Sequence, residues 1–298
     1  MQNFTLEVIM QPVMFSDAVR GNDHLRESFN DLAQATFGID FSDWYAAGHW
    51  DDHYIPHVLT VEDTVISNVS VSLMRFRIGG AEKNYIQLGT VMTHEAYRGK
   101  GLNRQVMERV LEKYAGRVDG IYLFANDSVL DYYPKYGFRP VTETEYFLPA
   151  QQFSVAKPYE LVPVEPESLY AAVSAGGANP NNGMYMWENL GLYQFWCAAE
   201  FGGSIFRIPE ADAYAVAEAD GTVLRICEII GPQLVELPRL AASFGPEIRE
   251  AVLCFTPGNR EGLSRRPHRE EDTTLFILGD DLSRIESEDL IFPVFSHA

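Results

Sequence analysis

One short segment constrains the fold of this chain more than any other feature of the sequence. Residues 94–107 (HEAYRGKGLNRQVM) place Arg98, Gly99, Lys100 and Gly101 directly after a strand-like apolar run and directly before a helical pattern. A turn between a strand and a helix points several unpaired backbone N–H groups the same way, and the helix dipole adds roughly half a positive charge there. Because glycine has no Cβ, the backbone can approach an anion closely. The segment predicts a strand–loop–helix unit that binds a phosphate group.

Two common phosphate-binding motifs do not fit this loop. The spaced second Gly-Lys-Ser/Thr of a Walker loop is absent. The dinucleotide fingerprint follows the first strand of its domain, whereas this loop follows the fourth or fifth predicted strand. Taken alone, the loop also fits a surface turn with two basic side chains, so the rest of the sequence has to decide.

Strand and helix patterns alternate through the first half of the chain. The runs 4–10, 57–63, 65–78, 84–93, 120–126 and 138–148 predict strands, and the runs 22–38, 102–116 and 128–137 predict helices. In the run 65–78, apolar residues alternate with Ser70 and Ser72, which predicts one buried face. Strands in series with helices between them predict a mixed α/β sheet.

A pause in this pattern suggests two domains. The stretch 156–168 holds three prolines and predicts a linker, so we expect domains at 1–150 and 151–298. Beyond the linker, the sequence predicts a helix at 182–203, a hairpin at 213–231 turned at Asp220–Gly221, and strands at 250–257 and 273–280. The runs 64–71 and 222–229 are similarly placed in the two halves, which hints at a weak internal repeat.

The amino-acid composition limits which classes of binding partner are expected. With 42 acidic and 23 basic side chains, the formal net charge of −19 disfavours nucleic acid and anionic membrane as partners. Such a charge would favour cationic small molecules, but solubility is the commoner reason for an excess of acidic residues and is the preferred explanation. Cys197, Cys227 and Cys254 are odd in number, far apart and in apolar surroundings, which predicts reduced core thiols. No apolar run approaches the ~20 residues that cross a bilayer. We therefore expect a soluble, cytoplasmic protein.

Two motifs together resemble those of the GNAT N-acetyltransferases. Residues 91–107 (VMTHEAYRGKGLNRQVM) resemble the strand, pyrophosphate loop and helix that hold acetyl-CoA in that family. Residues 125–138 (ANDSVLDYYPKYGF) resemble its second segment, with an Asn, a Tyr and a Gly-Phe that enters the last strands. The resemblance covers roughly residues 1–148. It implies a GNAT mixed sheet flanked by helices, acetyl-CoA as co-substrate and no metal, and it makes the second half a candidate degenerate GNAT-like repeat without a cofactor loop.

The resemblance also assigns roles to individual residues. It implies that Val91 and Thr93 offer backbone groups to the pantetheine arm, and that a free N–H there stabilises the developing oxyanion. Asn126 would contact the amide chain of the cofactor, and Tyr133 would be the general acid that protonates the leaving thiolate. The backbone amides of the loop would receive the pyrophosphate: Arg98, Gly99, Lys100, Gly101, Leu102 and Asn103. Asn103 stands where the family has a small residue, and its side chain can bond a phosphate oxygen.

The general base and the acceptor site are less defined. His94 and Glu95 lie at the end of the strand, but beside the phosphate loop and not beside the expected position of the thioester. A chain of water molecules that leads to an acidic side chain is an equally good candidate for the general base. The aromatic and acidic residues expected to line the acceptor pocket are Trp44, Tyr45, Trp50, Asp51, Asp52 and Tyr54. A surface helix with buried tryptophan explains them equally well. His49, His53 and His57 have a spacing that metal ligands use, but Pro56 interrupts a helix that would align them.

We therefore expect an acetyl-CoA-dependent N-acetyltransferase that acts on the primary amine of a small molecule. The alternative is a non-catalytic acyl-CoA-binding sensor or interaction module. We expect the second half to shape the acceptor pocket or to form a subunit contact, as in a homodimer. The apolar terminal run IFPVFSHA is expected simply to dock on the first domain. Because some members of the family it resembles bring the chain end into the active site, the resemblance makes His297 or the Ala298 carboxylate as a base the alternative.

Overall fold

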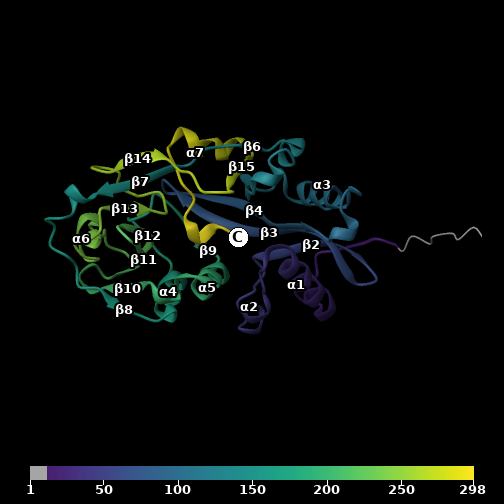
Figure 1. Ribbon diagram of the computed structural model, residues 1–298, viewed down its shortest axis with the longest axis horizontal. Coiled ribbons are helices and arrows are strands. Elements are labelled where there is room, and N and C mark those ends of the chain that lie inside the picture. Colours follow the sequence, from purple (N-terminus) through teal and green to yellow (C-terminus); the bar gives the residue numbers. More distant parts are fainter. Residues whose placement is uncertain (1–11) are drawn as a thin grey trace, which may run out of the picture.

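The protein folds around two mixed sheets, described here from a computed structural model for residues 12–298. The strand expected at 4–10 lies outside the described residues. The first sheet has the order β1-β2-β3-β4-β5-β15-β6, with β9 paired to one end of β3, and the second has the order β14-β7-β13-β12-β11-β10-β8. Figure 1 shows the two sheets side by side, with the C-terminal end of the chain at the centre of the molecule. The mixed α/β architecture expected from the sequence is confirmed.

The first sheet is built mainly from the first half of the chain. Its strands there are β1 (Met14–Ser16), β2 (Tyr54–Val61), β3 (Thr64–Ile78), β4 (Ala81–Thr93), β5 (Gly120–Ala125) and β6 (Arg139–Pro140), and its helices are α1 (Asp23–Phe37), α2 (Ser42–Ala46) and α3 (Leu102–Tyr114). The expected start and end of α1 are confirmed: Asn22 caps the helix by accepting a hydrogen bond from the backbone N–H of Leu25, and Gly38 ends it with a φ of 72°. The run 128–137 forms short 3-10 turns instead of the expected helix.

Strand β3 is buried on both faces, so the expectation of a single buried face was wrong. Ser70 and Ser72 are 0% and 2% exposed, about as well covered as the neighbouring Val69 and Val71. Both α1 and α3 pack against this strand. Because small hydroxyl side chains can hydrogen-bond inside the protein, an alternating pattern does not by itself place the second face in water.

Strands β4 and β5 pair over a short distance and then separate. Their parallel ladder joins Tyr85–Gln87 to Gly120–Tyr122 and ends there. Beyond it, β4 carries an irregularity in its pairing with β3, and Thr90 adopts a φ of 46°, which is rare for a residue with a Cβ. The gap between the two strands opens the first sheet in the region where the chain's C-terminal residues lie.

The second half contributes most of the other sheet and, among the described residues, four α-helices. Its elements are β8 (Val162–Pro163), α4 (Pro166–Ala175), β9 (Met184–Glu188), α5 (Leu190–Ala199), β10 (Ile205–Ile208), β11 (Ala213–Asp220), β12 (Val223–Ile230), α6 (Leu237–Ala242), β13 (Glu250–Leu253), β14 (Ser264–Pro267), β15 (Thr274–Leu278) and α7 (Arg284–Ser287). The expected hairpin at Asp220–Gly221 is confirmed. The expected helix at 182–203 was wrong in its first third, because Met184–Glu188 form a strand that pairs with β3.

Each half supplies a strand to the sheet of the other half. Strand β7 (Thr144–Pro149) follows the first sheet in the sequence but lies between β13 and β14 in the second. Strand β15, late in the chain, lies between β5 and β6 in the first sheet. The domain boundary expected at residue 150 stays a prediction, and this exchange of strands ties the two sheets together on either side of it.

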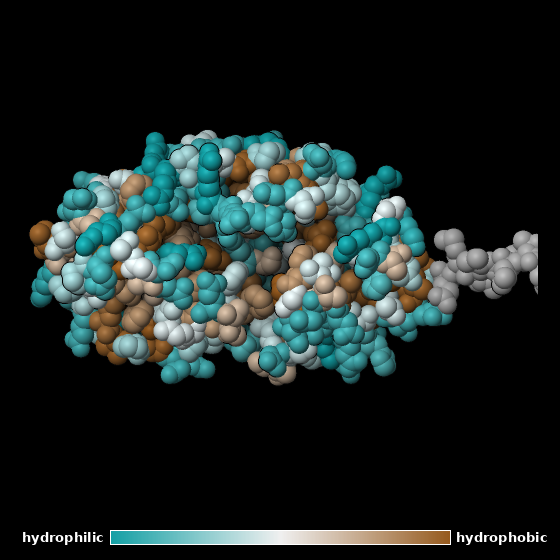
Figure 2. All heavy atoms as spheres, viewed as in Figure 1, coloured by the Kyte–Doolittle hydropathy of each residue, from teal (hydrophilic) through white to brown (hydrophobic). Residues whose placement is uncertain are grey.

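Apolar side chains fill the space between the sheets. One core cluster joins Phe76 and Tyr122 of the first sheet to Met186, Tyr193 and Phe292 of the second half. The rings of Tyr122 and Phe292 stack with their centroids 4.1 Å apart. Figure 2 shows a largely hydrophilic face with a hollow near its middle, where apolar atoms are visible. In residues 12–298, no helix is both long and apolar enough to span a membrane.

Candidate active site

A groove of about 690 Å³ lies where β4 separates from β5. Its walls come from the end of β4, the loop before α3, the end of β5 and the turns that follow β5. The lining residues are Thr36, Phe37, Leu88, Gly89, Thr90, Val91, Met92, Thr93, Arg98, Gly99, Asn103, Phe124, Ala125, Asn126, Ser128, Val129, Tyr132, Tyr133 and Ala298. The groove brings together both sequence motifs, although some 20 residues separate them along the chain.

The loop before α3 has the backbone geometry that an anion requires. Gly99 and Gly101 have φ values of 74° and 72°, and a Cβ at either position would meet nothing within 4 Å. Gly101 is the N-cap of α3, and no side chain in the described part of the chain caps the helix, so its first N–H groups can serve a ligand. The Nε of Arg98 donates to the carbonyl oxygen of Thr93 at 3.1 Å, which holds this guanidinium beside β4. These features fit a bound pyrophosphate.

The side chains of three other loop residues, Lys100, Leu102 and Asn103, are engaged with different parts of the protein. The Nζ of Lys100 donates to the carbonyl oxygen of Ala96 at 3.0 Å, and Lys100 is not among the residues that line the groove. The side chain of Leu102 is buried in the core beneath the sheet, so only its backbone can face a ligand. Asn103 donates to Ser67, Asn68 and Met92 and accepts from the hydroxyl of Tyr132 at 2.6 Å. Its amide therefore joins α3 to β3 and is already engaged within the protein.

The second motif places Asn126 and Tyr133 on the opposite wall. The amide nitrogen of Asn126 donates to the Asp272 carboxylate at 3.0 Å, in the loop before β15. Tyr133 is 5% exposed, and burial raises the pKa of its phenol to about 12. A phenol with this pKa keeps its proton at neutral pH and can give it to a stronger base.

A second cavity, of about 280 Å³, adjoins the groove. Thr90, Phe124 and Ala298 line both, so the two meet at the gap between β4 and β5. The other residues of this cavity are Ile39, Phe41, Trp44, Tyr54, Gln87, Leu192, Phe195, Trp196, Glu270, Thr273 and His297. Leu192, Phe195 and Trp196 come from α5, so the second half forms one wall of a cavity that the first half opens. We call this space the aromatic cavity.

The comparisons with known proteins agree with this geometry. Residues 16–141 match the family model described as an acetyltransferase (GNAT) domain. Residues 16–141 form a GNAT domain. A search of curated protein sequences found no match. The match of residues 16–141, over less than half of the chain, supports acyl transfer in general.

Solved structures extend the likeness of fold over both halves. The chain is similar to a GCN5-related N-acetyltransferase from Kribbella flavida, with 14% identity, 91% of this chain and 72% of that chain covered, and a TM-score of 0.58. It is also similar to Eis1 from Mycobacterium abscessus, with 14% identity, 89% and 73% covered, and a TM-score of 0.55. A putative acetyltransferase from Pyrococcus horikoshii has 14% identity, 94% of each chain covered and a TM-score of 0.50. Identities this low show a shared fold alone.

Only part of the expected acceptor wall lines the aromatic cavity. Trp44 and Tyr54 do. Trp50 is buried behind them and donates from its Nε1 to the carbonyl oxygen of Tyr54 at 2.9 Å, while Tyr45 packs under the guanidinium of Arg26. Asp51 pairs with the imidazole of His53 at 3.0 Å. Asp51 and Asp52 both line a separate groove near Arg20. Among residues 12–298, no group of three or more His, Cys, Asp or Glu is placed to hold a metal ion.

The cavity residues that sequence reasoning missed come from distant parts of the chain. Phe41 lies only three residues before Trp44 and shares its aromatic run, so a local signal for it existed. Gln87 and Phe124 lie on strands whose pattern indicates only burial. Phe195, Trp196 and Glu270 reach the GNAT domain from the second half, and no periodicity in the sequence connects them to it.

The C-terminal residues of the described chain are held firmly at the junction of the groove and the cavity. Three consecutive main-chain oxygens each accept a side-chain hydrogen bond: Ser296 from Tyr122 at 3.0 Å, His297 from Trp196 at 2.7 Å and Ala298 from Gln87 at 2.8 Å. The imidazole of His297 stacks on Phe124 with centroids 3.9 Å apart. Burial lowers the pKa of His297 to about 3, so this side chain is neutral at physiological pH. The expected docking of this segment is confirmed.

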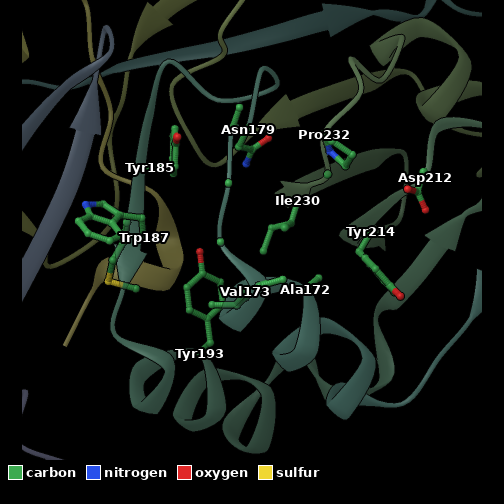
Figure 3. Close-up of a pocket in the computed structure, with 16 residues that line it drawn as sticks. Ala172, Val173, Asn179, Tyr185, Trp187, Tyr193, Asp212, Tyr214, Ile230 and Pro232 are labelled. Atoms are coloured by element: carbon green, nitrogen blue, oxygen red, sulfur yellow. The ribbon is translucent and has the colours of Figure 1, made fainter.

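A third cavity, of about 330 Å³, lies in the second half and shares no lining residue with the other two. Figure 3 shows Val173, Tyr193 and Ile230 around it, with Tyr185 and Trp187 along one side. The hydroxyl of Tyr193 donates to the Glu228 carboxylate at 3.0 Å, so it is already engaged within the protein. At the end of β12, Gly231 packs against Ala213, where an added Cβ would come within 2.6 Å. No basic, glycine-rich loop follows β12 as one follows β4.

Proposed function

We propose that this protein transfers an acetyl group from acetyl-CoA to the primary amine of a small molecule. One observation supports this most strongly: the groove and the aromatic cavity meet at Thr90, Phe124 and Ala298. Acetyl-CoA in the groove, with its pyrophosphate at the loop before α3, would bring its thioester to this junction. An amine held in the aromatic cavity would reach the thioester from the other side.

The reaction would be a direct attack without a covalent enzyme intermediate. The amine nitrogen forms a bond to the acetyl carbon, the carbon–sulfur bond breaks, and the sulfur leaves as a thiolate. Tyr133 would then give its phenolic proton to the sulfur. A thiol with a pKa of about 8.5 is a stronger acid than the buried phenol of Tyr133, so proton transfer from Tyr133 to a free thiolate is unfavourable. The transfer requires that negative charge develops on the sulfur beside the phenol as the carbon–sulfur bond breaks. The tyrosine then regains a proton from solvent or from the ammonium that formed.

The proton that the amine must lose before attack needs an acceptor. The pKa of about 3 at His297 and its stacking on Phe124 favour a packing role for this side chain. Glu270, on the wall of the aromatic cavity, is exposed and can relay the proton to water. The Ala298 carboxylate as a base stays a prediction, as does the role of each groove residue inferred from the family resemblance.

The test begins with calorimetric titration of acetyl-CoA into the full chain, followed by thiol release in the presence of amines. We expect saturable binding, and release of CoA that depends on the amine. Tyr133→Phe should reduce kcat by about 10²-fold, the low end for losing a general acid, while the acetyl-CoA Kd stays the same. Tyr146→Phe is the matched control, because Tyr146 is also buried, at 2% exposed, but lies on β7 in the second sheet.

Binding of acetyl-CoA without any turnover would point to the non-catalytic sensor instead. Equal loss of activity in both tyrosine variants would mean that the effect comes from stability and not from proton transfer. Absence of acetyl-CoA binding would refute the proposed function.

A further inference from the structure

We propose that the acceptor is a primary amine carried on an aromatic body, such as an arylalkylamine, and not a polyamine or a polyhydroxylated amine. This inference rests on the proposed function and concerns the same site. It follows from the walls of the aromatic cavity, from the engagement of their polar groups and from the distribution of charge around them.

The walls are rings contributed by both halves of the chain. Phe41 stacks on Phe195 with centroids 6.0 Å apart, and Trp44 meets Phe195 edge-to-face at 5.8 Å. On the side toward the groove, Phe124 and Trp196 continue this surface. Aromatic rings prefer edge-to-face or offset contacts with other rings, and the cavity presents both edges and faces. A flat aromatic ligand would complete a packing arrangement that the protein has already begun.

Most hydrogen-bond donors on these walls are already engaged within the protein, whereas the amide oxygen of Gln87 and the Nε2 of His297 have no partner among the described residues. The indole N–H of Trp44 donates to the carbonyl oxygen of Gly191 at 2.8 Å, and that of Trp196 to His297. The hydroxyl of Tyr54 pairs with Thr90 at 2.7 Å, and the amide nitrogen of Gln87 donates to Ala298. A ligand with many hydroxyl groups would lose its bonds to water here and find few replacements, which is the unfavourable case for binding.

The charges around the cavity suit a single cation. Among residues 12–298, Glu270 is the only carboxylate side chain that lines the cavity, and no lysine or arginine of this range lines it. Its neighbour His297 is neutral at physiological pH. An ammonium group near the junction would also lie close to aromatic faces, which attract cations. A polyamine would bring further positive charges into a space whose described lining offers only Glu270 and the Ala298 carboxylate at the junction as partners.

The size of the cavity agrees with a compact ligand. A volume of about 280 Å³ is near the lower end for small-molecule sites. The ammonium end would have to face Thr90 and Ala298, because the cavity opens there toward the groove.

The experiment compares amines in the CoA-release assay at equal concentration. The probes are 2-phenylethylamine and tryptamine against spermidine and glucosamine. We expect kcat/KM to be at least tenfold higher for the two aromatic amines. Phe195→Ala should raise the KM for 2-phenylethylamine about tenfold and leave the acetyl-CoA Kd unchanged. Phe206→Ala is the matched control, since Phe206 is also half-buried in the second half but lies on β10, edge-on to Phe244 and away from the cavity.

A second readout does not depend on catalysis. Trp44 and Trp196 line the cavity, so 2-phenylethylamine added to the protein with CoA should change the tryptophan fluorescence saturably, and the change should weaken in Phe195→Ala. Release of CoA with spermidine or glucosamine but not with the aromatic amines would overturn the inference and leave the proposed function standing. Failure of acetyl-CoA to bind, or absence of CoA release with every amine, would instead overturn the proposed function, and this inference with it.

Discussion

Replacing Gly89 by alanine should strain the contact between β4 and the C-terminal residues. A Cβ on Gly89 would lie 2.5 Å from the carbonyl oxygen of Ala298, whereas ordinary contacts begin at 3.4 Å. The obstacle is backbone, so it cannot swing away as a flexible side chain would. The backbone of Gly89 is not in the left-handed region, and nothing else in the structure opposes an alanine at this position.

The magnitude follows from these contacts. Moving Ala298 by roughly 1 Å would break its hydrogen bond from Gln87, which is worth about 1 kcal/mol. Overpacking typically costs about 1–3 kcal/mol, and replacing glycine by alanine returns about 0.4–1 kcal/mol through the unfolded chain. We therefore expect Gly89→Ala to lower the free energy of unfolding by about 2 kcal/mol.

Urea unfolding of four chains measures this strain directly. The chains are the full sequence and a version shortened by Ala298, each with and without Gly89→Ala. In the shortened chain the clash is absent, so the substitution should be neutral or slightly stabilising, and the cycle should show a coupling of about 2 kcal/mol. Gly21→Ala is the control, because a Cβ there meets nothing within 4 Å. An equal cost of Gly89→Ala in both backgrounds would refute the placement of Ala298 against β4.

Three further predictions concern single charged groups. Burial raises the pKa of Glu228 to about 7, so the contribution of this shift to stability is complete below pH 4.5 and is lost as the pH rises through 7. In the unsubstituted protein the free energy of unfolding should therefore fall between pH 5 and pH 8, and Glu228→Gln should reduce that fall by about 3 kcal/mol. An unchanged pH profile in Glu228→Gln would refute this. Arg98→Ala should raise the Kd of acetyl-CoA, measured by calorimetry, about fivefold, which is the loss expected from one exposed charge-assisted hydrogen bond. Lys100→Ala, and Arg117→Ala at another exposed position, should each raise this Kd less. Glu270→Gln should raise the KM for amine acceptors about threefold at low salt and less at high salt, and a salt-independent effect would argue against a charge interaction.

Local sequence signals predicted the GNAT half well, because they act over a few residues. The glycines at 99 and 101, the helix after them and the Asn and Tyr of the second motif all lie where the patterns indicated. The cap at Asn22 and the turn at Gly221 also follow from single residues with strong preferences. The helix predicted at 182–203 was wrong in its first third because strand β9 and helix α5 are separated by a single residue, Asn189, which caps the helix by accepting a hydrogen bond from the backbone N–H of Leu192.

The acceptor side of the site could not be predicted in the same way. Tyr45, Trp50 and Asp51 share their local composition with Trp44 and Tyr54, but which of them faces a cavity depends on what packs behind them. The amide of Asn103 has the same ambiguity, since it can bond a phosphate or, as here, the neighbouring strand. Which side chains face a cavity, and which bond within the protein, depends on contacts between residues far apart in the chain.

The sequence by itself determined the glycine-rich loop before α3, most of the order of strands and helices in the first half, and the match of residues 16–141 to a GNAT domain. These depend on backbone preferences and short-range spacing, which a linear pattern records. Only the tertiary structure decided that β7 and β15 change sheets, that α5 closes the aromatic cavity, and that Ala298 lies against Gly89. The reason is physical: long-range pairing is chosen by how well buried surfaces fit together, and that fit has no periodicity in the sequence.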